Sequence, residues 1–433
     1  MSKIDTDDTG VGSYFIANYP PFSFWSADQL QAAEEALDRP GTAPLGLYLH
    51  IPFCRKRCKF CYFRVYTDKN SRDIEAYLGA VATEVELLSR RRALERPLQF
   101  VYFGGGTPSF LSAAQIETLV EGLTRSISWD SAEEVTFECE PGTLSRAKVK
   151  ALAGIGVTRL SLGIENFDDE VLQENGRAHL SGEIYRSWEW IEEADFPAVN
   201  VDLIAGMVGE SDENWDRCLE KTLALSPDSV TIYQMELPFN TVYSREMIDG
   251  EGKGRVATWS QKREWVRRAF ARFQEAGYHV SSGYTLVRDP ERCKFVYRDA
   301  LWRGADMVGV GVASFSHVSS VHYQNLDRFE EYVEALDQGR LPLARAFRVS
   351  DRERLIRELI LQMKLGRLDA SYFRTKFGAS ILEEFEEPFA ALRGERYLDW
   401  KKDRIELSRE GLLRVDSLLP GFFLPEHRDA RYT

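Results

Sequence analysis

Residues 48–61 read YLHIPFCRKRCKFC, a short apolar run that leads into three cysteines, Cys54, Cys58 and Cys61. The apolar run predicts a buried strand, and the cysteines after it have the spacing C-x3-C-x2-C. The remaining cysteines are isolated, at Cys139, Cys218 and Cys293. Thiolates are the ligands of iron–sulfur clusters, and a cubane cluster has four irons, so three thiolates leave one iron open. An open metal position is typical of a reactive site and not of a closed structural one.

Two other interpretations use the same thiols. A zinc site would recruit His50 as a fourth ligand, but structural zinc sites usually take their ligands from two separated pairs, and the chain has no further C-x2-C or H-x3-H pair. A disulfide with one spare thiol would need an oxidising compartment, and nothing in the sequence signals one.

The spacing of the cysteines resembles the signature of the radical S-adenosylmethionine (SAM) enzymes. The flanking Y-x-H-I-P-F-C resembles the oxygen-independent coproporphyrinogen III oxidases and their relatives, which include heme chaperones and radical methyltransferases. This resemblance implies a [4Fe–4S] cluster on Cys54, Cys58 and Cys61, with SAM chelating the open iron. It also implies that an electron from the cluster cleaves SAM to methionine and a 5′-deoxyadenosyl radical. Tyr48 is expected to support the side of the site that holds the cluster or a second ligand. Tyr48 and Glu138 are also expected to act in catalysis.

Length and composition limit the remaining possibilities. The 433 residues suggest about two to three domains, or one barrel with attachments, and 44% hydrophobic with 28% charged residues is ordinary for a soluble globular protein. A net charge of −13 argues against a nucleic-acid partner. No apolar run approaches the roughly 20 residues of a membrane span, and the N-terminus does not resemble a signal peptide. We therefore expect a cytoplasmic protein without a membrane partner.

Short apolar runs alternate with amphipathic patterns from Leu45 onward, which predicts an α/β fold. Because such alternation is typical of a parallel sheet covered by helices, we expect a closed or partial parallel β/α barrel of the radical SAM type. The predicted strands are Leu45–Ile51, Gln99–Phe103, Glu134–Cys139, Thr158–Leu162, Val199–Ile204 and Ser229–Met235. The predicted helices are Ser71–Arg92, Ser112–Ser126, Ser145–Gly154, Ser181–Ala194 and Asp212–Leu225. Functional residues are expected at the carboxyl ends of the strands.

Glycines follow the second predicted strand, at Gly104, Gly105 and Gly106, and precede Thr107-Pro108. By themselves they would indicate only a tight turn in which backbone approaches closely. With the flanking residues they resemble the family's GGGTP motif, which holds the amino group of SAM. The resemblance thus assigns the three glycines and Thr107 to SAM binding.

Three further positions at or after strand ends match family contacts to SAM. Glu138 ends the third strand, where a carboxylate would meet a cationic amine. Glu165 stands where the family usually has glutamine, which keeps an acceptor and removes the amide donor to ribose. Arg177 matches the arginine that pairs with the SAM carboxylate, although a helix-cap arginine on the surface would look the same.

The fifth strand runs into Asp202-Leu203-Ile204-Ala205-Gly206, which resembles the family's D-L-I-x-G, and we predict Asp202 and Ala205 as cofactor contacts. A later segment, Val308–Ser316, contains two glycines and would otherwise be interpreted as a core strand. In the oxidases the matching segment lies beside a second SAM molecule, so Ala313 and Phe315 are predicted to contact it. One or two SAM molecules are therefore expected.

The chain divides into three predicted regions. Residues 1–44 are too aromatic for a disordered tail and are expected to form an N-terminal arm that covers the barrel or acts as a lid. Residues 45–345 are expected to form the barrel domain, in which Tyr278–Gly283 and Asp306–Ser314 make a further strand pair. Residues 346–433 predict a mostly helical, winged-helix-like domain, in which helices precede a small hairpin.

The leading hypothesis is a radical SAM enzyme that abstracts hydrogen from a tetrapyrrole or a natural-product scaffold. The next step is either oxidative decarboxylation of a propionate, or methyl transfer and ring formation with a second SAM. Phe63 stands where the oxidases have a further cysteine, which weakens a literal oxidase assignment. A heme-trafficking protein is the alternative of a different class, with axial ligands among His50, His179, His317 and His322. A monomer reduced by a partner such as flavodoxin or ferredoxin is expected.

Overall fold

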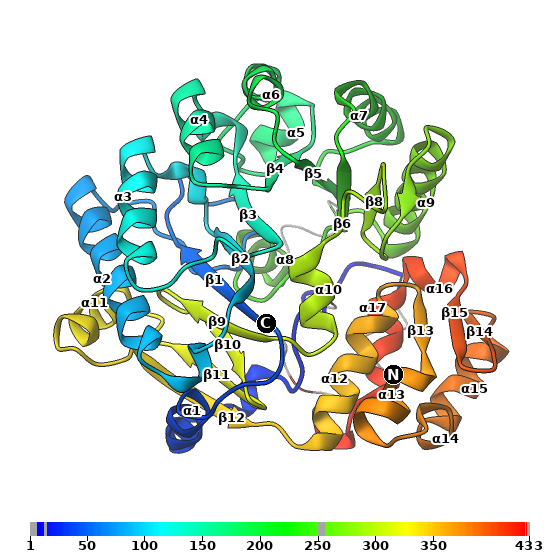
Figure 1. Cartoon of the computed structure of the whole chain (residues 1–433). Coiled ribbons are helices and arrows are strands. Elements are labelled where there is room, and N and C mark those ends of the chain that lie inside the picture. Colours follow the sequence, from blue (N-terminus) through cyan, green and yellow to red (C-terminus); the bar gives the residue numbers. More distant parts are fainter. Residues whose placement is uncertain (1–6, 13–14, 250–255, 429, 431–433) are drawn as a thin grey trace.

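The structure is a computed structural model, and it describes residues 7–12, 15–249, 256–428 and 430. One large sheet dominates the part of the chain described (Figure 1). Its strands are β1 (Leu45–Ile51), β2 (Leu98–Gly105), β3 (Glu134–Cys139), β4 (Arg159–Glu165), β5 (Ala198–Ala205), β6 (Ser229–Gln234), β7 (His279–Val280), β8 (Thr285–Val287), β9 (Asp306–Val310), β10 (Phe315–Val318), β11 (Val321–Asn325) and β12 (Leu343–Arg348). Their order is β12-β11-β10-β9-β1-β2-β3-β4-β5-β6-β8-β7.

The centre of this sheet is parallel. Every neighbouring pair from β9 through β1 to β6 is parallel, as in the pairing of Leu47 with Val101 and of Val201 with Val230. The strands curve into an open arc with helices outside it (Figure 1). The predicted α/β fold with a partial parallel barrel is confirmed, and so are its six predicted strands.

Antiparallel strands extend both edges, and here one prediction was wrong. The segments Tyr278–Gly283 and Asp306–Ser314 do not pair with each other, because β7 pairs with β8 at one edge while β9 pairs with β1 near the other. The hairpin β10–β11 and the strand β12 were not predicted. β10 and β11 are short and follow each other without a helix between them, and β12, which follows the helix α11 (Phe329–Asp337), joins the sheet antiparallel.

Helices cover the convex side of the arc. They are α2 (Ser71–Ser89), α3 (Ala113–Thr124), α4 (Arg146–Gly154), α5 (Asp169–Glu174), α6 (Ser181–Ala194), α7 (Asp212–Leu225) and α9 (Trp259–Glu275). The side chains of Asn70 and Ser112 accept hydrogen bonds from the first turns of α2 and α3, which fixes where these helices begin. In α3 the residues Ile116, Leu119 and Leu123 face the sheet at helical spacing and are buried.

The last fifth of the chain builds a second hydrophobic core beside the open side of the arc (Figure 1). Its helices are α12 (Asp351–Met363), α13 (Ala370–Phe377), α14 (Ile381–Glu384), α15 (Glu386–Gly394), α16 (Arg409–Leu413) and α17 (Val415–Leu418). A small sheet has the order β13 (Arg367–Asp369), β15 (Arg404–Leu407) and β14 (Leu398–Lys401). The predicted C-terminal helices and hairpin are thus present, with one strand added.

The N-terminal arm joins the two cores. Ile16 and Tyr19 are buried in the C-terminal core, and the Tyr19 hydroxyl accepts the backbone N–H of Leu424 at 3.0 Å. The ammonium group of Lys364, fully buried, donates to the carbonyl of Ile16 at 2.8 Å and pairs with Asp416 at 2.8 Å. Among the described residues, none of the helices has the length and apolar character that crossing a membrane requires.

A buried carboxylate, Glu84 of α2, ties the helix layer to the edge of the sheet. It accepts hydrogen bonds from the Tyr332 hydroxyl at 2.5 Å, the Gly311 N–H at 2.8 Å and the Asn325 amide at 2.6 Å. Burial nevertheless raises the pKa of Glu84 to about 7, because desolvation penalises the charged form more than these donors favour it.

We expect the free energy of unfolding to depend on this group. The pKa of Glu84 in the folded protein lies above its ordinary value of 4.5. The contribution of Glu84 to the free energy of unfolding is therefore complete below pH 4.5 and is lost as the pH rises toward about 7. At 1.36 kcal/mol for each unit, the loss is of the order of 3 kcal/mol. Urea unfolding at pH 5 and pH 8 should show a smaller decrease in Glu84→Gln than in the parent protein. Equal decreases in the two proteins would contradict the assignment.

Candidate active site

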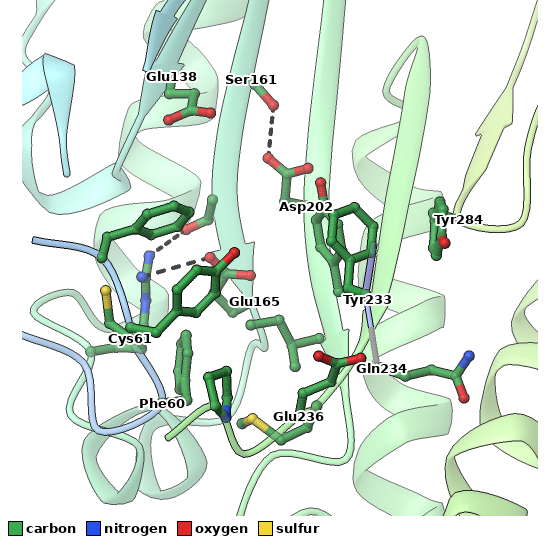
Figure 2. Close-up of a pocket in the computed structure, with 18 of the residues that line it drawn as sticks. Phe60, Cys61, Glu138, Ser161, Glu165, Asp202, Tyr233, Gln234, Glu236 and Tyr284 are labelled. Carbon is green, nitrogen blue, oxygen red and sulfur yellow. Dashed lines mark hydrogen bonds and ion pairs between the residues drawn. The ribbon is translucent and has the colours of Figure 1, made fainter. Parts of the chain in front are cut away.

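A cavity of about 450 Å³ lies at the carboxyl ends of the central parallel strands (Figure 2). Each strand from β2 to β6 contributes a residue at or just after its end, namely Gly106, Glu138, Glu165, Asp202 and Gln234. This is the edge of a parallel sheet where ligands usually bind, and the volume suits a small organic molecule.

The cysteine loop is fastened to the glycine motif by backbone hydrogen bonds. The N–H of Gly106 donates to the carbonyl of Ile51 at 2.8 Å, and the N–H of Thr107 donates to the carbonyl of Phe53 at 2.9 Å. A Cβ on Gly106 would lie 3.0 Å from the Cys54 sulfur and 2.9 Å from backbone of Pro52. Only glycine therefore allows this close approach.

All six cysteines are free thiols, which excludes the disulfide interpretation. Cys54 is buried and receives a hydrogen bond from the Thr107 hydroxyl at 3.3 Å, while Cys61 lines the cavity. Burial raises the pKa of Cys54 to about 12, and the nearby thiols Cys58 and Cys61 raise it further. Within the described part of the chain, no three His, Cys, Asp or Glu side chains lie close enough to hold a single metal ion.

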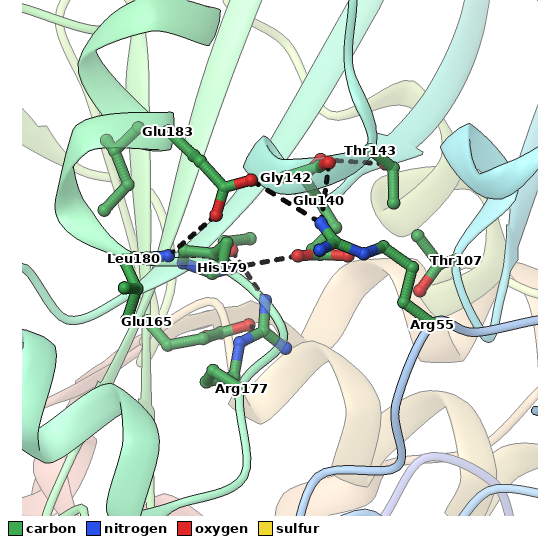
Figure 3. Close-up of polar contacts among 12 residues, drawn as sticks. Arg55, Thr107, Glu140, Gly142, Thr143, Glu165, Arg177, His179, Leu180 and Glu183 are labelled. Carbon is green, nitrogen blue, oxygen red and sulfur yellow. Dashed lines mark hydrogen bonds and ion pairs between the residues drawn. The ribbon is translucent and has the colours of Figure 1, made fainter.

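Arg177 links the cysteine loop to the strand ends. Its guanidinium donates to the Cys58 sulfur at 3.4 Å and to the carbonyl of Gly163 at 2.8 Å, and lies 3.6 Å from a Glu165 carboxylate oxygen (Figure 3). Burial lowers the pKa of Arg177, but the thiol of Cys58 and the carboxylate of Glu165 raise it more, so the group stays charged. Its Nε is buried without a hydrogen-bond partner in the described structure, which leaves one donor for a ligand. The interpretation of Arg177 as a surface helix cap was wrong.

Three carboxylates project into the same space. Glu138 accepts the Tyr102 hydroxyl at 2.7 Å, and Asp202 accepts the Ser161 hydroxyl at 2.7 Å (Figure 2). Burial raises the pKa of Glu138 to about 7, that of Glu165 to about 7 and that of Asp202 to about 6. Glu165 also adopts a left-handed backbone with φ of 64°, uncommon for a residue with a side chain. Buried carboxylates of this kind favour a ligand that brings positive charge.

Other predicted residues lie behind the cavity wall. The N–H of Gly105 donates to Glu138 at 3.2 Å, and a Cβ on Gly104 would lie 3.0 Å from the Tyr48 hydroxyl. Tyr48 itself stacks on Tyr102, with ring centroids 5.7 Å apart. These residues shape the wall and support Glu138, whereas Gly106 and Thr107 line the cavity directly.

The remaining predicted contacts lie elsewhere. Ala205 is fully buried in β5. Ala313 follows β9, and its N–H donates to the carbonyl of Leu326 at 2.8 Å. Phe315 begins β10, and its ring packs edge to face against the ring of Trp25 in the N-terminal arm, with centroids 5.4 Å apart. None of the three is among the described residues that line the cavity, so the cofactor contact of Ala205 and the contacts of Ala313 and Phe315 with a second SAM stay predictions.

The four histidines considered as heme ligands are buried, and three of them have polar partners in the interior, whereas the Nε2 of His50 has no hydrogen-bond partner in the described structure. His179 lies 3.2 Å from Glu140 and from the carbonyl of Ile164 (Figure 3). The Nδ1 atoms of His317 and His322 lie 3.1 Å apart, and burial lowers the pKa of His50 to about 4. No histidine is found among the described residues that line the cavity.

Sequence reasoning missed the wall of the cavity opposite the cysteines. That wall consists of aromatic and charged residues from the arm, β6, α9 and the C-terminal region, namely Phe15, Tyr233, Trp259, Arg263, Tyr284 and Asp416. The position of Tyr233 near the end of β6 was a usable signal. The others come from segments that no local pattern connects to the cysteines.

Comparison with known proteins agrees with this geometry. The sequence profile of the radical SAM superfamily matches residues 48–222, which carry the cysteine loop, the glycine motif, Glu138 and Arg177. Over these residues the chain is similar to the radical SAM superfamily. It is 28% identical over 391 residues to an oxygen-independent coproporphyrinogen III oxidase of Synechocystis sp., a match that covers 87% of this chain and 79% of that protein.

Two further similarities extend over most of the chain. It is 26% identical over 396 residues to the heme chaperone HemW of Lactococcus lactis, covering 90% of this chain and 99% of that protein. The solved structure of coproporphyrinogen III oxidase from Escherichia coli has a TM-score of 0.82 at 23% identity, with 94% and 96% of the two chains covered. The protein is therefore coproporphyrinogen III oxidase-like in sequence and fold.

The similarity to the radical SAM superfamily implies a [4Fe–4S] cluster and SAM, and the residues fit both. The loop offers three neighbouring thiols and no carboxylate, a donor set that suits iron–sulfur clusters, and Cys61 opens onto the cavity. For SAM, the cavity offers the spare donor of Arg177 and the acceptors Glu138 and Asp202.

Proposed function

We propose that this protein is a radical SAM enzyme that acts on a carboxylate-bearing tetrapyrrole, in the manner of the coproporphyrinogen III oxidases. Cys54, Cys58 and Cys61 would hold the [4Fe–4S] cluster, and the cavity beside them would hold SAM. When bound, the two together supply a 5′-deoxyadenosyl radical that abstracts hydrogen from an unreactive carbon, chemistry that no side chain provides.

One observation carries the proposal: Arg177 touches both the Cys58 sulfur and Glu165, and keeps a buried, unpartnered Nε in the described structure. A carboxylate placed there would lie next to the cysteine loop and receive a charge-assisted hydrogen bond. The Glu138 and Asp202 side chains would accept the ammonium group and hydroxyls of the same ligand. The cavity would thus bind a zwitterionic ligand whose carboxylate and ammonium groups each meet a side chain of opposite charge.

Aromatic side chains would exclude water from the reacting carbon. Phe60, Tyr62 and Phe63 flank the third cysteine and line the cavity, and Tyr233 and Tyr284 lie across from them (Figure 2). The ring of Phe15 in the N-terminal arm packs edge to face against the ring of Tyr284, with centroids 5.5 Å apart. A flat apolar substrate body suits these walls, since rings favour stacked and edge-to-face contacts.

A cation on the far wall supports a carboxylate-bearing substrate. Arg263 of α9 lines the cavity beside Trp259, and its Nε is buried without a hydrogen-bond partner in the described structure. Burial lowers the pKa of Arg263 and the nearby Arg414 lowers it further, which outweighs the opposing effect of Asp7 and Glu410, so an anion bound there would stabilise the charge. A propionate of a tetrapyrrole has the required chemistry.

Replacing Arg263 with leucine should therefore weaken binding of a tetracarboxylate. A hydrogen bond to a charged group contributes about 1.5–3 kcal/mol, so we expect roughly a tenfold to hundredfold increase in Kd. Fluorescence titration with coproporphyrin III measures this directly, and Arg217→Leu, an exposed arginine of α7 away from the cavity, is the control. Equal affinities for the parent and Arg263→Leu would exclude this anchor.

The reaction class is tested by products under anaerobic conditions. Reconstituted protein with dithionite and SAM should form 5′-deoxyadenosine, and adding coproporphyrinogen III should release carbon dioxide. Formation of S-adenosylhomocysteine would instead favour methyl transfer. If a fully loaded cluster forms no 5′-deoxyadenosine, the proposal is overturned in favour of heme trafficking, the role that the name of the heme chaperone HemW describes.

A further inference from the structure

The loop that carries the cysteines has a charge opposite to that of the whole chain. Between Cys54 and Cys61 the intervening residues include four cations and no acid, namely Arg55, Lys56, Arg57 and Lys59. The chain as a whole has a net charge of −13. Arg55, Lys56 and Arg57 are exposed, so this positive charge faces solvent directly above the sulfur ligands.

Two of these cations are neutralised locally and two are not. Arg55 donates to the carbonyl of Gly142 at 2.7 Å and lies 3.6 Å from Glu183 (Figure 3). Lys59 pairs with Glu174 at 3.2 Å.

The other two cations have no acidic partner in the described structure. Arg57 donates to the backbone carbonyls of Cys61 and Asn240, both at 3.2 Å. Lys56 makes no hydrogen bond or ion pair with any described residue. Lys56 and Arg57 therefore present two uncompensated charges.

We propose that this exposed loop, residues 55–57, is the docking surface for an acidic electron-carrier protein. The inference rests on the proposed function, which needs one electron delivered to the cysteine-bound cluster for each cleavage of SAM. In that step the carrier is oxidised by one electron and the cluster is reduced by one. A low-potential flavin or iron–sulfur protein is the chemical class required.

The position of the loop supports this role. Lys56 lies two residues from both Cys54 and Cys58, and consecutive Cα atoms are about 3.8 Å apart, so the Lys56 Cα lies within about 8 Å of either ligand Cα. Cys58, which follows Arg57 directly, is partly exposed, whereas Cys54 is buried.

The charge of the rest of the molecule supports an acidic partner. A net charge of −13 repels such a protein over most of the surface, while the loop attracts it, which steers encounters to the cluster. Electron-transfer complexes have small interfaces and are transient, so two or three charged side chains contribute a large part of the binding free energy.

Binding measured without turnover tests the proposal. Calorimetric titration of the reconstituted protein with an acidic flavodoxin at low ionic strength should show a Kd that rises with added salt. Lys56→Glu should weaken this binding about tenfold, and Lys56→Glu with Arg57→Glu should weaken it more. The control is Lys401→Glu, at an exposed lysine of β14 that also makes no ion pair with an acid among the described residues. All variants should retain the iron content of the parent.

The electron source then separates this inference from the proposed function. With dithionite, Lys56→Glu should form 5′-deoxyadenosine at the parental rate, and with reduced flavodoxin its rate should fall about tenfold at low salt. Flavodoxin affinity that is independent of salt, or equal for parent and Lys56→Glu, would overturn the docking surface even if dithionite supports turnover. If dithionite gives no product with the parent, the proposed function fails, and the titration still decides the docking surface.

Discussion

Replacement of Cys58 with alanine should abolish 5′-deoxyadenosine formation. Two thiols remain to hold a cubane that needs three, and the Arg177 guanidinium loses the sulfur to which it donates at 3.4 Å. We therefore expect loss of the iron–sulfur absorbance after anaerobic reconstitution, a fall in bound iron to near the background, and turnover reduced at least a thousandfold. Absorbance and iron analysis report on the cluster, and product analysis reports on turnover.

The control must remove a thiol without touching the loop. Cys218 is fully buried in α7, and its replacement by alanine deletes a single sulfur from the core. This variant should keep both cluster and activity. A parental iron content in Cys58→Ala, or an equal loss in both variants, would show that the thiols of the loop are not the ligands.

The parallel core was predictable because its strands are short apolar runs that end in a recognisable residue. Glu138, Glu165 and Asp202 were identified separately in the sequence, and they meet in one cavity because neighbouring parallel strands end at the same edge of a sheet. Hydrophobic periodicity and parallel topology together thus predict many of the residues that line the cavity on the side of the cysteines.

The far wall depends on tertiary contacts that no local pattern encodes. Arg263 reaches the cavity from α9, and Asp416 reaches it from the C-terminal region, which is positioned by the buried Lys364 and by the arm. The two-residue strand β7 is too short to show a period, so its partner could not be inferred. Whether a long-range ion pair or a short edge strand forms is decided by packing, and the linear sequence does not display it.

The substitution Arg177→Leu should have the second-largest effect, on affinity for SAM. The guanidinium is held by Gly163 and Glu165, and its unpartnered Nε is the buried donor available to a carboxylate beside the cysteine loop. Removing it costs a charge-assisted hydrogen bond and leaves Glu165 without its cation. We expect Kd for SAM to rise about a hundredfold, measured by equilibrium dialysis with radiolabelled SAM.

Lysine at the same position separates charge from shape. Arg177→Lys keeps the positive charge but lacks the planar fork, so SAM affinity should recover only in part. Arg186→Leu, on the exposed face of α6, is the control and should bind SAM as the parent does. Iron content should be near parental in all three variants, because the thiols remain. Parental SAM affinity in Arg177→Leu would assign this arginine to support of the cysteine loop alone.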